Sequence, residues 1–313
     1  MFDMHFDLLT VAYKAYLEKD FTFLEEWCKN YTDGNVRGLI ANLYFMSKEE
    51  MRTEIHPKYY QDEVSVVEMF KIAKQIVETY LPNTKIIWSI EGCDYLDIND
   101  LEELYNEGLR NILPVWNEKN KYASGNRSDD GLTEEGKRLL DKLMELGISI
   151  DISHANEKSF YDIIEYVKQQ DQLPLVIASH SNAKTLCDRR RNLTDKQLYA
   201  LKDIDGLVGI FSNRNFIVKP ERKDIATKKE QRKEYLNHIK HVVDIMGIDN
   251  VVLATDDMTF ASAADPEYKE VPIYNYSTLA YNLTDDLRKY YTAEEIKKLL
   301  YKTAEDRYYN RLI

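Results

Sequence analysis

Five residues of types that bind metal ions lie at the ends of short apolar runs, MFDMHFDLL, KIIWSIEG, GISIDISH and LPLVIASH; they are His5, Asp7, Glu91, His154 and His180. Buried parallel strands read as such runs, so a polar residue closing one indicates a catalytic face rather than a core. Imidazole and carboxylate ligands suit zinc. Two zinc ions about 3.5–4 Å apart could share a hydroxide, lower its pKa and polarise a substrate carbonyl, which is hydrolytic chemistry.

The spacing of these residues favours a shared site. His5 and Asp7 are two apart on an expected strand, so both side chains should point to the same face, near the mouth of a barrel. Glu91 precedes Gly92, which allows a sharp turn, and its two oxygens could bridge two cations. Each residue alone has a structural alternative: a polar cluster at a strand end, a salt-bridge partner or a hydrogen-bonded core histidine. Together, on four strand ends, they predict a metal centre.

Two further groups could act on a substrate. Asp256 closes the run VVLATD and could take a proton from a water and pass it to a leaving amine, or it could merely cap the next segment. In CDRRRNLTDKQL, a guanidinium could hold a carboxylate or an oxyanion. Arg191 is a candidate, but side-chain chemistry does not separate it from Arg189 and Arg190.

The sequence pattern predicts alternating strands and helices, and these elements must position the candidate residues. Eight strand candidates cover 2–9, 36–45, 85–91, 111–116, 147–153, 174–180, 206–211 and 250–256. Amphipathic stretches of helical period, such as 63–81, 133–146 and 158–170, lie between them. Alternation of this kind implies parallel strands, and eight can close a barrel. With no linker and no repeat, we expect one (β/α)8 TIM-type barrel domain over 1–313.

Composition limits the class of protein. With 313 residues, of which 44% are hydrophobic, the chain can bury a large core without disulfides. Its three cysteines form no C-x-x-C pair and no run approaches the length of a bilayer span, so we expect a soluble, cytoplasmic protein that binds no membrane. A formal charge of −12 disfavours a nucleic-acid partner.

Two further segments and the three histidines outside the expected metal centre also allow predictions. The segment 259–281 is long enough to cover a site, and the Lys/Arg-rich stretch 219–233 is expected to be a solvated loop and helix start. His56 should lie in a loop, whereas His238 and His241 should lie on a helix in solvated or core-edge positions.

The motifs resemble the membrane (renal) dipeptidase family of zinc peptidases, within the amidohydrolase superfamily. DMHFD, SIEG, GLTEEGKRLLDKLMELGISIDISH and ASHSNAKTLCDRRRNL carry the resemblance, and HIKHVVDIMGIDNVVLATD fits it more weakly. It implies a barrel with two zinc ions bridged by Glu91, His5 and Asp7 on one ion and His154 and His180 on the other. It also implies Arg191 as the substrate-binding arginine, Asp256 as the proton carrier, and hydrolysis of dipeptides, often with a D-residue at the C-terminal position. A homodimer is expected from the resemblance alone.

Two positions depart from the family pattern. Trp116 stands where many members have a substrate-binding histidine, so Asn117 or Asn120 is a candidate replacement donor. In ATDDM, Asp257 occupies a place where an aromatic residue is usual, and alternation along the strand directs it away from Asp256.

Two other functions stay open at this point. One is another metal-dependent amidohydrolase on the same barrel, such as a lactonase, amidase or nuclease; the other is a non-catalytic homologue that keeps the metals. The ligand types are common to these classes, whereas ASHSNA and CDRRRN favour a dipeptide.

Overall fold

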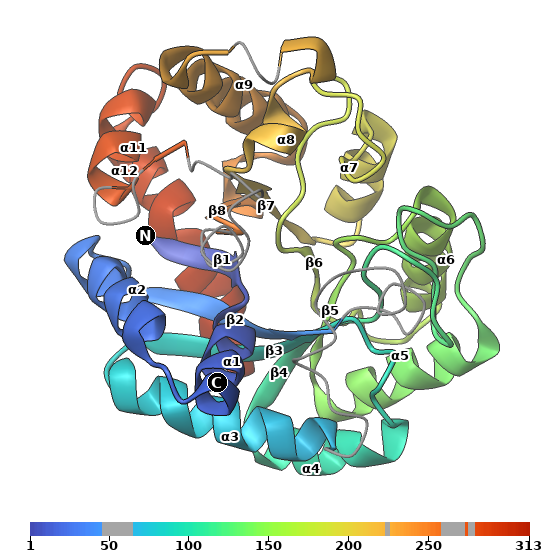
Figure 1. Cartoon of the computed structure of the whole chain (residues 1–313). Helices are drawn as coiled ribbons and strands as arrows, with labels where there is room; N and C mark the ends of the chain where they lie inside the picture. Colours follow the sequence, from blue (N-terminus) through green and yellow to red (C-terminus); the bar gives the residue numbers. More distant parts are fainter. Residues whose placement is uncertain (46–64, 223–225, 258–272, 275–278) are drawn as a thin grey trace.

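The computed structural model describes residues 1–45, 65–222, 226–257, 273–274 and 279–313. Eight parallel strands form one sheet in chain order, from β1 to β8, and β8 returns to lie beside β1. Helices surround this ring of strands (Figure 1), which confirms the predicted (β/α)8 barrel. The strands are β1 (Phe2–Phe6), β2 (Gly38–Tyr44), β3 (Lys85–Glu91), β4 (Leu109–Leu113), β5 (Ser149–Asp151), β6 (Val176–Ala178), β7 (Leu207–Phe211) and β8 (Val251–Ala254).

The described helices follow the strands in turn. They are α1 (Leu8–Glu18), α2 (Thr22–Asp33), α3 (Val66–Tyr80), α4 (Leu101–Asn106), α5 (Glu134–Leu146), α6 (Glu157–Lys168), α7 (Asp195–Lys202), α8 (Arg214–Ile217), α9 (Lys228–Met246), α11 (Leu279–Leu287) and α12 (Ala293–Lys297). Short 3₁₀ turns are η2 (Ile98–Asp100), η3 (Pro220–Arg222) and η4 (Ile248–Asn250). After α12 the chain continues through two π-helical stretches, η6 (Lys298–Lys302) and η7 (Glu305–Tyr309), into α13 (Asn310–Leu312).

Local sequence explains where the helices begin. Thr194, Thr227 and Thr292 each cap a helix by accepting a hydrogen bond from the third following backbone N–H, while a Gln or Glu side chain at that position bonds back. This capping box satisfies two backbone donors that would otherwise have no partner. The helices predicted over 63–81, 133–146 and 158–170 correspond to α3, α5 and α6.

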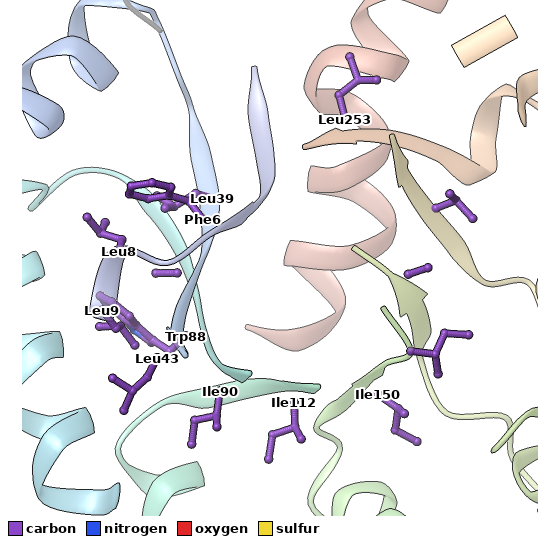
Figure 2. Packing of buried hydrophobic residues seen from close by; sticks show 14 of the residues in the cluster. Phe6, Leu8, Leu9, Leu39, Leu43, Trp88, Ile90, Ile112, Ile150 and Leu253 are labelled. Carbon is purple, nitrogen blue, oxygen red and sulfur yellow. The ribbon is translucent and has the colours of Figure 1, made fainter. Parts of the chain in front are cut away.

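Apolar side chains fill two layers. The larger lies between strands and helices, where the outward-facing residues of the strands pack against the helix faces (Figure 2). The smaller lies inside the barrel and includes Phe2, Met4 and Ile87. Tyr308 closes the amino-terminal end of the barrel, where its hydroxyl lies 2.7 Å from Oγ of Ser149. Polar groups gather at the opposite end, which in barrels of this type carries the active site.

A carboxylate joins the first and last strands. Oδ1 of Asp3 accepts hydrogen bonds from the backbone N–H groups of His5 (3.2 Å) and Thr255 (2.8 Å), and the N–H of Asp256 donates to the carbonyl of His5 at 3.1 Å. Asp3 therefore holds the segments of His5 and Asp256 together, although they are about 250 residues apart in sequence.

Some boundaries differ from prediction. The first strand, predicted over 2–9, ends at Phe6, because Leu8 and Leu9 belong to the buried face of α1. The strands predicted over 147–153 and 174–180 are only three residues long, β5 and β6. The basic stretch forms η3 and the start of α9 as predicted, except that 223–225 lies outside the described residues. Most of the loop 259–281, and His56, also lie outside them.

The three cysteines, Cys28, Cys93 and Cys187, are buried and form no disulfide. Among the described helices, none combines the length and apolar character needed to cross a bilayer.

His238 lies on α9 as predicted, but it is fully buried rather than solvated or at the core edge. Its Nδ1 accepts from the N–H of Ala183 at 3.1 Å and its Nε2 donates to the carbonyl of Ile217 at 3.2 Å. His241, on the same helix, is half-buried and lies 2.8 Å from Asp195.

His238 should make the fold sensitive to acid. Burial lowers its pKa from 6.5 to about 4, because the charged imidazolium would lose its hydration there, and the nearby His241 adds to this. The unfolded chain takes up this proton below pH 6.5 and the folded chain does not, so stability falls as the pH drops from 6.5 towards 4. Between pH 7.5 and 5 the loss is of order 2 kcal/mol.

Urea unfolding of the wild type and of His238→Gln at both pH values measures this loss. The variant should lose less stability on acidification by about that amount, whereas His241→Gln, the control, should behave as the wild type. Equal losses in wild type and His238→Gln would contradict the assignment.

Candidate functional site

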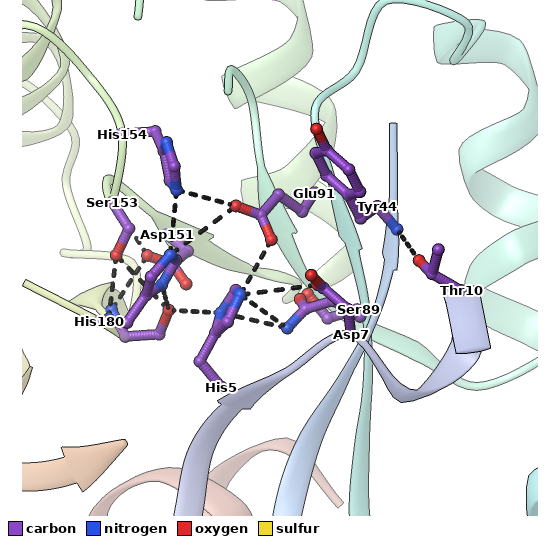
Figure 3. A network of polar contacts seen from close by, with 12 residues as sticks. His5, Asp7, Thr10, Tyr44, Ser89, Glu91, Asp151, Ser153, His154 and His180 are labelled. Atoms are coloured by element: carbon purple, nitrogen blue, oxygen red, sulfur yellow. Dashed lines mark hydrogen bonds and ion pairs between the residues drawn. The ribbon is translucent and has the colours of Figure 1, made fainter. Parts of the chain in front are cut away.

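The five metal-type residues converge at the carboxyl-terminal end of the barrel (Figure 3). Glu91 is the last residue of β3, while three others follow their strands: Asp7 comes one residue after β1, His154 three after β5 and His180 two after β6. His5 lies in β1. All five are more than nine-tenths buried except His154, which is nearly so.

Glu91 lies between the histidines. Its Oε2 is 2.9 Å from Nε2 of His5, and its Oε1 is 3.1 Å from Nε2 of His154 and 3.7 Å from Nε2 of His180. Two groups with ligand atoms within 4.8 Å of one another share this carboxylate: His5, Asp7 and Glu91 form one, and Glu91, His154 and His180 form the other. His5, His180 and Asp256 form a third such group.

Local backbone structure directs these side chains to the mouth. An irregularity interrupts the pairing of β1 with β2 between Asp3 and Phe6, and Asp7 lies beyond the strand. Asp7 is the N-cap of α1, yet its side chain makes no capping hydrogen bond. The carboxylate thus faces the cluster, with Oδ1 3.7 Å from Nε2 of His5. Both side chains do face the mouth as predicted, but not through the simple alternation of a continuous strand.

Gly92 lets the chain turn directly after Glu91. Its φ is +79°, and a Cβ there would lie 2.3 Å from the carbonyl oxygen of Phe45. Any other residue would push β3 from its neighbour. His154 and Asp256 themselves have positive φ values, 69° and 47°, which are uncommon for residues other than glycine and concentrate at functional sites.

The charges in the cluster favour a cation. Burial would lower the pKa of His5, but the carboxylates of Glu91, Asp7 and Asp256 outweigh burial and raise it to about 9. Burial raises the pKa of Asp7 well above its ordinary value, and the neighbouring Glu91 adds to this. The same negative field that holds a proton on His5 would attract a metal ion.

The other two histidines are in a different state. Burial, with Arg191 nearby, lowers the pKa of His154 to about 3, and burial with His5 lowers that of His180 well below its ordinary value. Burial alone would raise the pKa of Glu91, yet His5 and His154 hold it well below its ordinary value. Neutral imidazoles beside an ionised carboxylate are the protonation states that metal ligation requires.

The buried oxygens fit a metal centre. Oδ1 of Asp7 and Oε1 of Glu91 accept no hydrogen bond from any residue that the structure describes. A buried carboxylate oxygen that accepts no hydrogen bond costs folding free energy, so such an oxygen usually marks a function or a bound ion. The donor set, three imidazoles and two carboxylates, is the type that zinc prefers in catalytic sites.

The structure distinguishes among the three arginines. Arg191 is buried, and its guanidinium donates to the carbonyl of His180 (2.8 Å) and to Oγ of Ser181 (3.1 Å). Arg189 instead donates to the carbonyl of Asn215, and the exposed Arg190 pairs with Asp129. Of the three, Arg191 lies against the cluster.

Asp256 faces the cluster beside Arg191. Burial raises its pKa to about 6, while the positive charges of His5 and Arg191 oppose this rise. Asp257 turns away, as predicted, and its Oδ2 accepts from Nε1 of Trp27 at 3.4 Å.

Trp116 and Asn117 border the site next to His154. The Trp116 ring lies 5.8 Å from the His154 ring and 4.8 Å from that of Tyr44. Oδ1 of Asn117 lies 3.1 Å from Nδ1 of His154 and accepts from Asn126 at 2.6 Å. The Asn120 side chain stabilises its own turn, where Oδ1 accepts from the backbone N–H groups of Tyr122 and Ala123 and Nδ2 donates to the carbonyl of Pro114.

Four polar residues that surround the histidines were not predicted from the sequence. Asn42, Asp151, Ser153 and Ser179 are buried polar residues around the histidines. A signal for three of them exists in ISIDISH and IASH, since polar residues that alternate with isoleucine or alanine should point into the barrel.

Comparisons with known proteins identify the family of the chain. The profile of the membrane dipeptidase family, peptidase family M19, matches residues 41–304. A protein of Klebsiella pneumoniae from the pqqA 5′ region is 38% identical over 177 residues, which cover 53% of this chain and 62% of the relative. An uncharacterised dipeptidase of Schizosaccharomyces pombe is 30% identical over 55% of this chain and 41% of its own length. The chain thus spans less than two thirds of these relatives.

The fold has a counterpart among solved structures. A metallopeptidase from Rhodobacter sphaeroides, solved with a phosphinate mimic of L-Ala-D-Ala, superposes with a TM-score of 0.76 at 21% identity, covering 100% of this chain and 98% of that one. This likeness concerns the fold. Because the family profile matches most of the sequence and the motif residues meet at one barrel mouth, the chain belongs to the membrane dipeptidase family.

Proposed function

We propose that the protein is a metal-dependent dipeptidase that holds two zinc ions and hydrolyses the amide bond of dipeptides. The observation that carries this proposal is the position of Glu91, whose two oxygens face His5 on one side and His154 on the other. Family membership and the dipeptidase names of some relatives support the substrate class.

The residues fit two metal positions that share one carboxylate. His5 and Asp7 would hold one ion, His154 and His180 the other, and Glu91 both. When bound, the two ions would supply a hydroxide nucleophile at neutral pH and polarise the scissile carbonyl. Oδ1 of Asp7 and Oε1 of Glu91, which accept no hydrogen bond from the described residues, support this arrangement.

The remaining residues would bind and orient the dipeptide. Arg191 would hold its terminal carboxylate with N–H groups not used on His180 and Ser181. Asp256, ionised at neutral pH, would accept a proton at a carboxylate oxygen and pass it to the leaving amine. Trp116 would form an apolar wall, and Asn117 would border the same side.

Other expectations stay predictions. They are a single domain over 1–313, a homodimer, a cytoplasmic location and tolerance of a C-terminal D-residue.

Amine release from a panel of dipeptides tests the function. L-L and L-D dipeptides should be cleaved, whereas N-acetylated amino acids, lactones and phosphodiesters should not. Turnover of a lactone or phosphodiester with no release from any dipeptide would assign a different hydrolase, and no turnover of any substrate by the metal-loaded protein would indicate a non-catalytic homologue.

Arg191 gives a prediction about substrate recognition. Because a charge-assisted hydrogen bond contributes about 1.5–3 kcal/mol, Arg191→Lys should raise KM for dipeptides by roughly 10- to 100-fold. The effect should shrink for dipeptide amides, which lack the carboxylate. Arg190→Lys is the matched control, since Arg190 is exposed and pairs with Asp129. An unchanged KM for free dipeptides would refute this role.

A further inference from the structure

One hydroxyl group lies between two of the three histidines. Oγ of Ser179 is 3.2 Å from Nδ1 of His5 and 2.9 Å from Nδ1 of His180. The two imidazole rings stack with their centroids 3.5 Å apart, and Ser179 is fully buried. Each ring also belongs to a group that lacks the other: His5 lies with Asp7 and Glu91, and His180 with Glu91 and His154, although both share a third group with Asp256.

The direction of these hydrogen bonds follows from the ring orientations. His5 and His180 both turn Nε2 towards Glu91, at 2.9 and 3.7 Å. An imidazole that binds a cation through Nε2 carries its proton on Nδ1, and this proton needs an acceptor. A hydroxyl oxygen has two lone pairs, so Ser179 can accept from both rings at once. The Asn42 amide also lies against His5, with Nδ2 3.1 Å from the same Nδ1, and it must turn its oxygen to this side to share that proton.

The hydroxyl proton of Ser179 must then be donated elsewhere. Asp151 is fully buried beside it, and its Oδ1 accepts from the backbone N–H groups of Ser179 (3.1 Å) and Ser153 (3.0 Å). Oδ2 of Asp151 accepts no hydrogen bond from the described residues. Burial raises the pKa of Asp151, and the Ser179 hydroxyl opposes this rise, as a donor to the carboxylate would.

We propose that Ser179 is a positioning residue shared by both halves of the metal centre, its oxygen accepting from Nδ1 of His5 and His180 while Asp151 accepts its proton. This inference rests on the proposed function of the site. His154 is oriented separately, because its Nδ1 faces Asn117. Loss of the Ser179 hydroxyl should therefore weaken both metal positions, and loss of the Asn117 amide only one.

The experiment measures zinc affinity rather than turnover. Apo protein is titrated with zinc against a chromophoric chelator, which gives two stepwise dissociation constants for the wild type. Partners of metal-binding histidines typically contribute 10- to 100-fold in affinity. Ser179→Ala should raise both constants by roughly that factor, whereas Asn117→Ala should raise one. Ser89→Ala is the matched buried control, since the Oγ of Ser89 accepts from Asn111 instead of an imidazole ring.

A second pair of variants isolates the hydroxyl if Ser179→Ala does not fold. Ser179→Thr and Ser179→Val have the same shape, but only threonine keeps the hydroxyl, so it should bind zinc more tightly at both positions. Equal constants for this pair, or a change at one position alone, would overturn the inference. If the wild-type protein binds two zinc ions without cleaving dipeptides, the proposed function is refuted, but the zinc affinities of the variants still decide the role of Ser179. If the wild type binds no zinc, both proposals are refuted.

Discussion

Glu91→Gln should lose both metal ions and reduce kcat/KM for dipeptides by about a thousandfold or more, since a catalytic metal and its hydroxide supply several kcal/mol of transition-state stabilisation. Glutamine keeps the shape of the side chain but removes its negative charge. It also replaces one carboxylate oxygen, which faces His5 or His154, with an amide NH₂ group that cannot bind a metal ion. Because both metal-binding groups share this carboxylate, one substitution should affect both.

Elemental analysis and amine release on the same preparation measure the two effects. Ser89→Ala is the matched control: Ser89 lies on the same strand and is equally buried, but its Oγ accepts from Asn111. The control should keep both metals and near wild-type turnover. Glu91→Gln protein with two metals and turnover within threefold of wild type would contradict the shared role of this carboxylate.

Asp256→Asn should keep both metals and lose kcat by roughly 10²- to 10⁴-fold, the range typical of general acid–base catalysis. Asparagine is nearly isosteric and cannot take up the proton that Asp256 would transfer. In the wild type, burial raises the pKa of Asp256 to about 6. A base acts only when deprotonated, so wild-type kcat/KM should fall on the acid side, at or below about pH 6.

Asp257→Asn is the control for this variant, because Asp257 faces Trp27 instead of the cluster. It should retain turnover. If Asp256→Asn lost metal together with activity, Asp256 would be a ligand with His5 and His180, and the assignment as proton carrier would be wrong. Unchanged turnover would also contradict it.

The barrel could be predicted from sequence because each buried parallel strand is a short apolar run, and the runs alternate with helical periods. The five metal-type residues could be found for the same reason, since they close such runs. The end of β1 could not be placed, because Leu8 and Leu9 suit a buried helix face as well as a strand. Apolar runs of this length do not separate the two structures.

Other features depend on contacts between distant segments. Side-chain chemistry could not choose among the three arginines. The family resemblance points to Arg191, and packing against His180 places it at the cluster. The burial of His238 depends on Ala183 and Ile217, which belong to other parts of the chain. Ser179 and His5 are 174 positions apart, and a single sequence does not show that two such distant residues are in contact.

The most direct test of the central claim is a zinc titration of chelator-stripped protein, followed by dipeptide hydrolysis and elemental analysis at each point. We expect no amine release from the stripped protein and a rise in activity that reaches its plateau at two zinc ions per chain. Full hydrolysis by metal-free protein, or zinc binding at the cluster that never restores hydrolysis of any dipeptide, would contradict the proposed function.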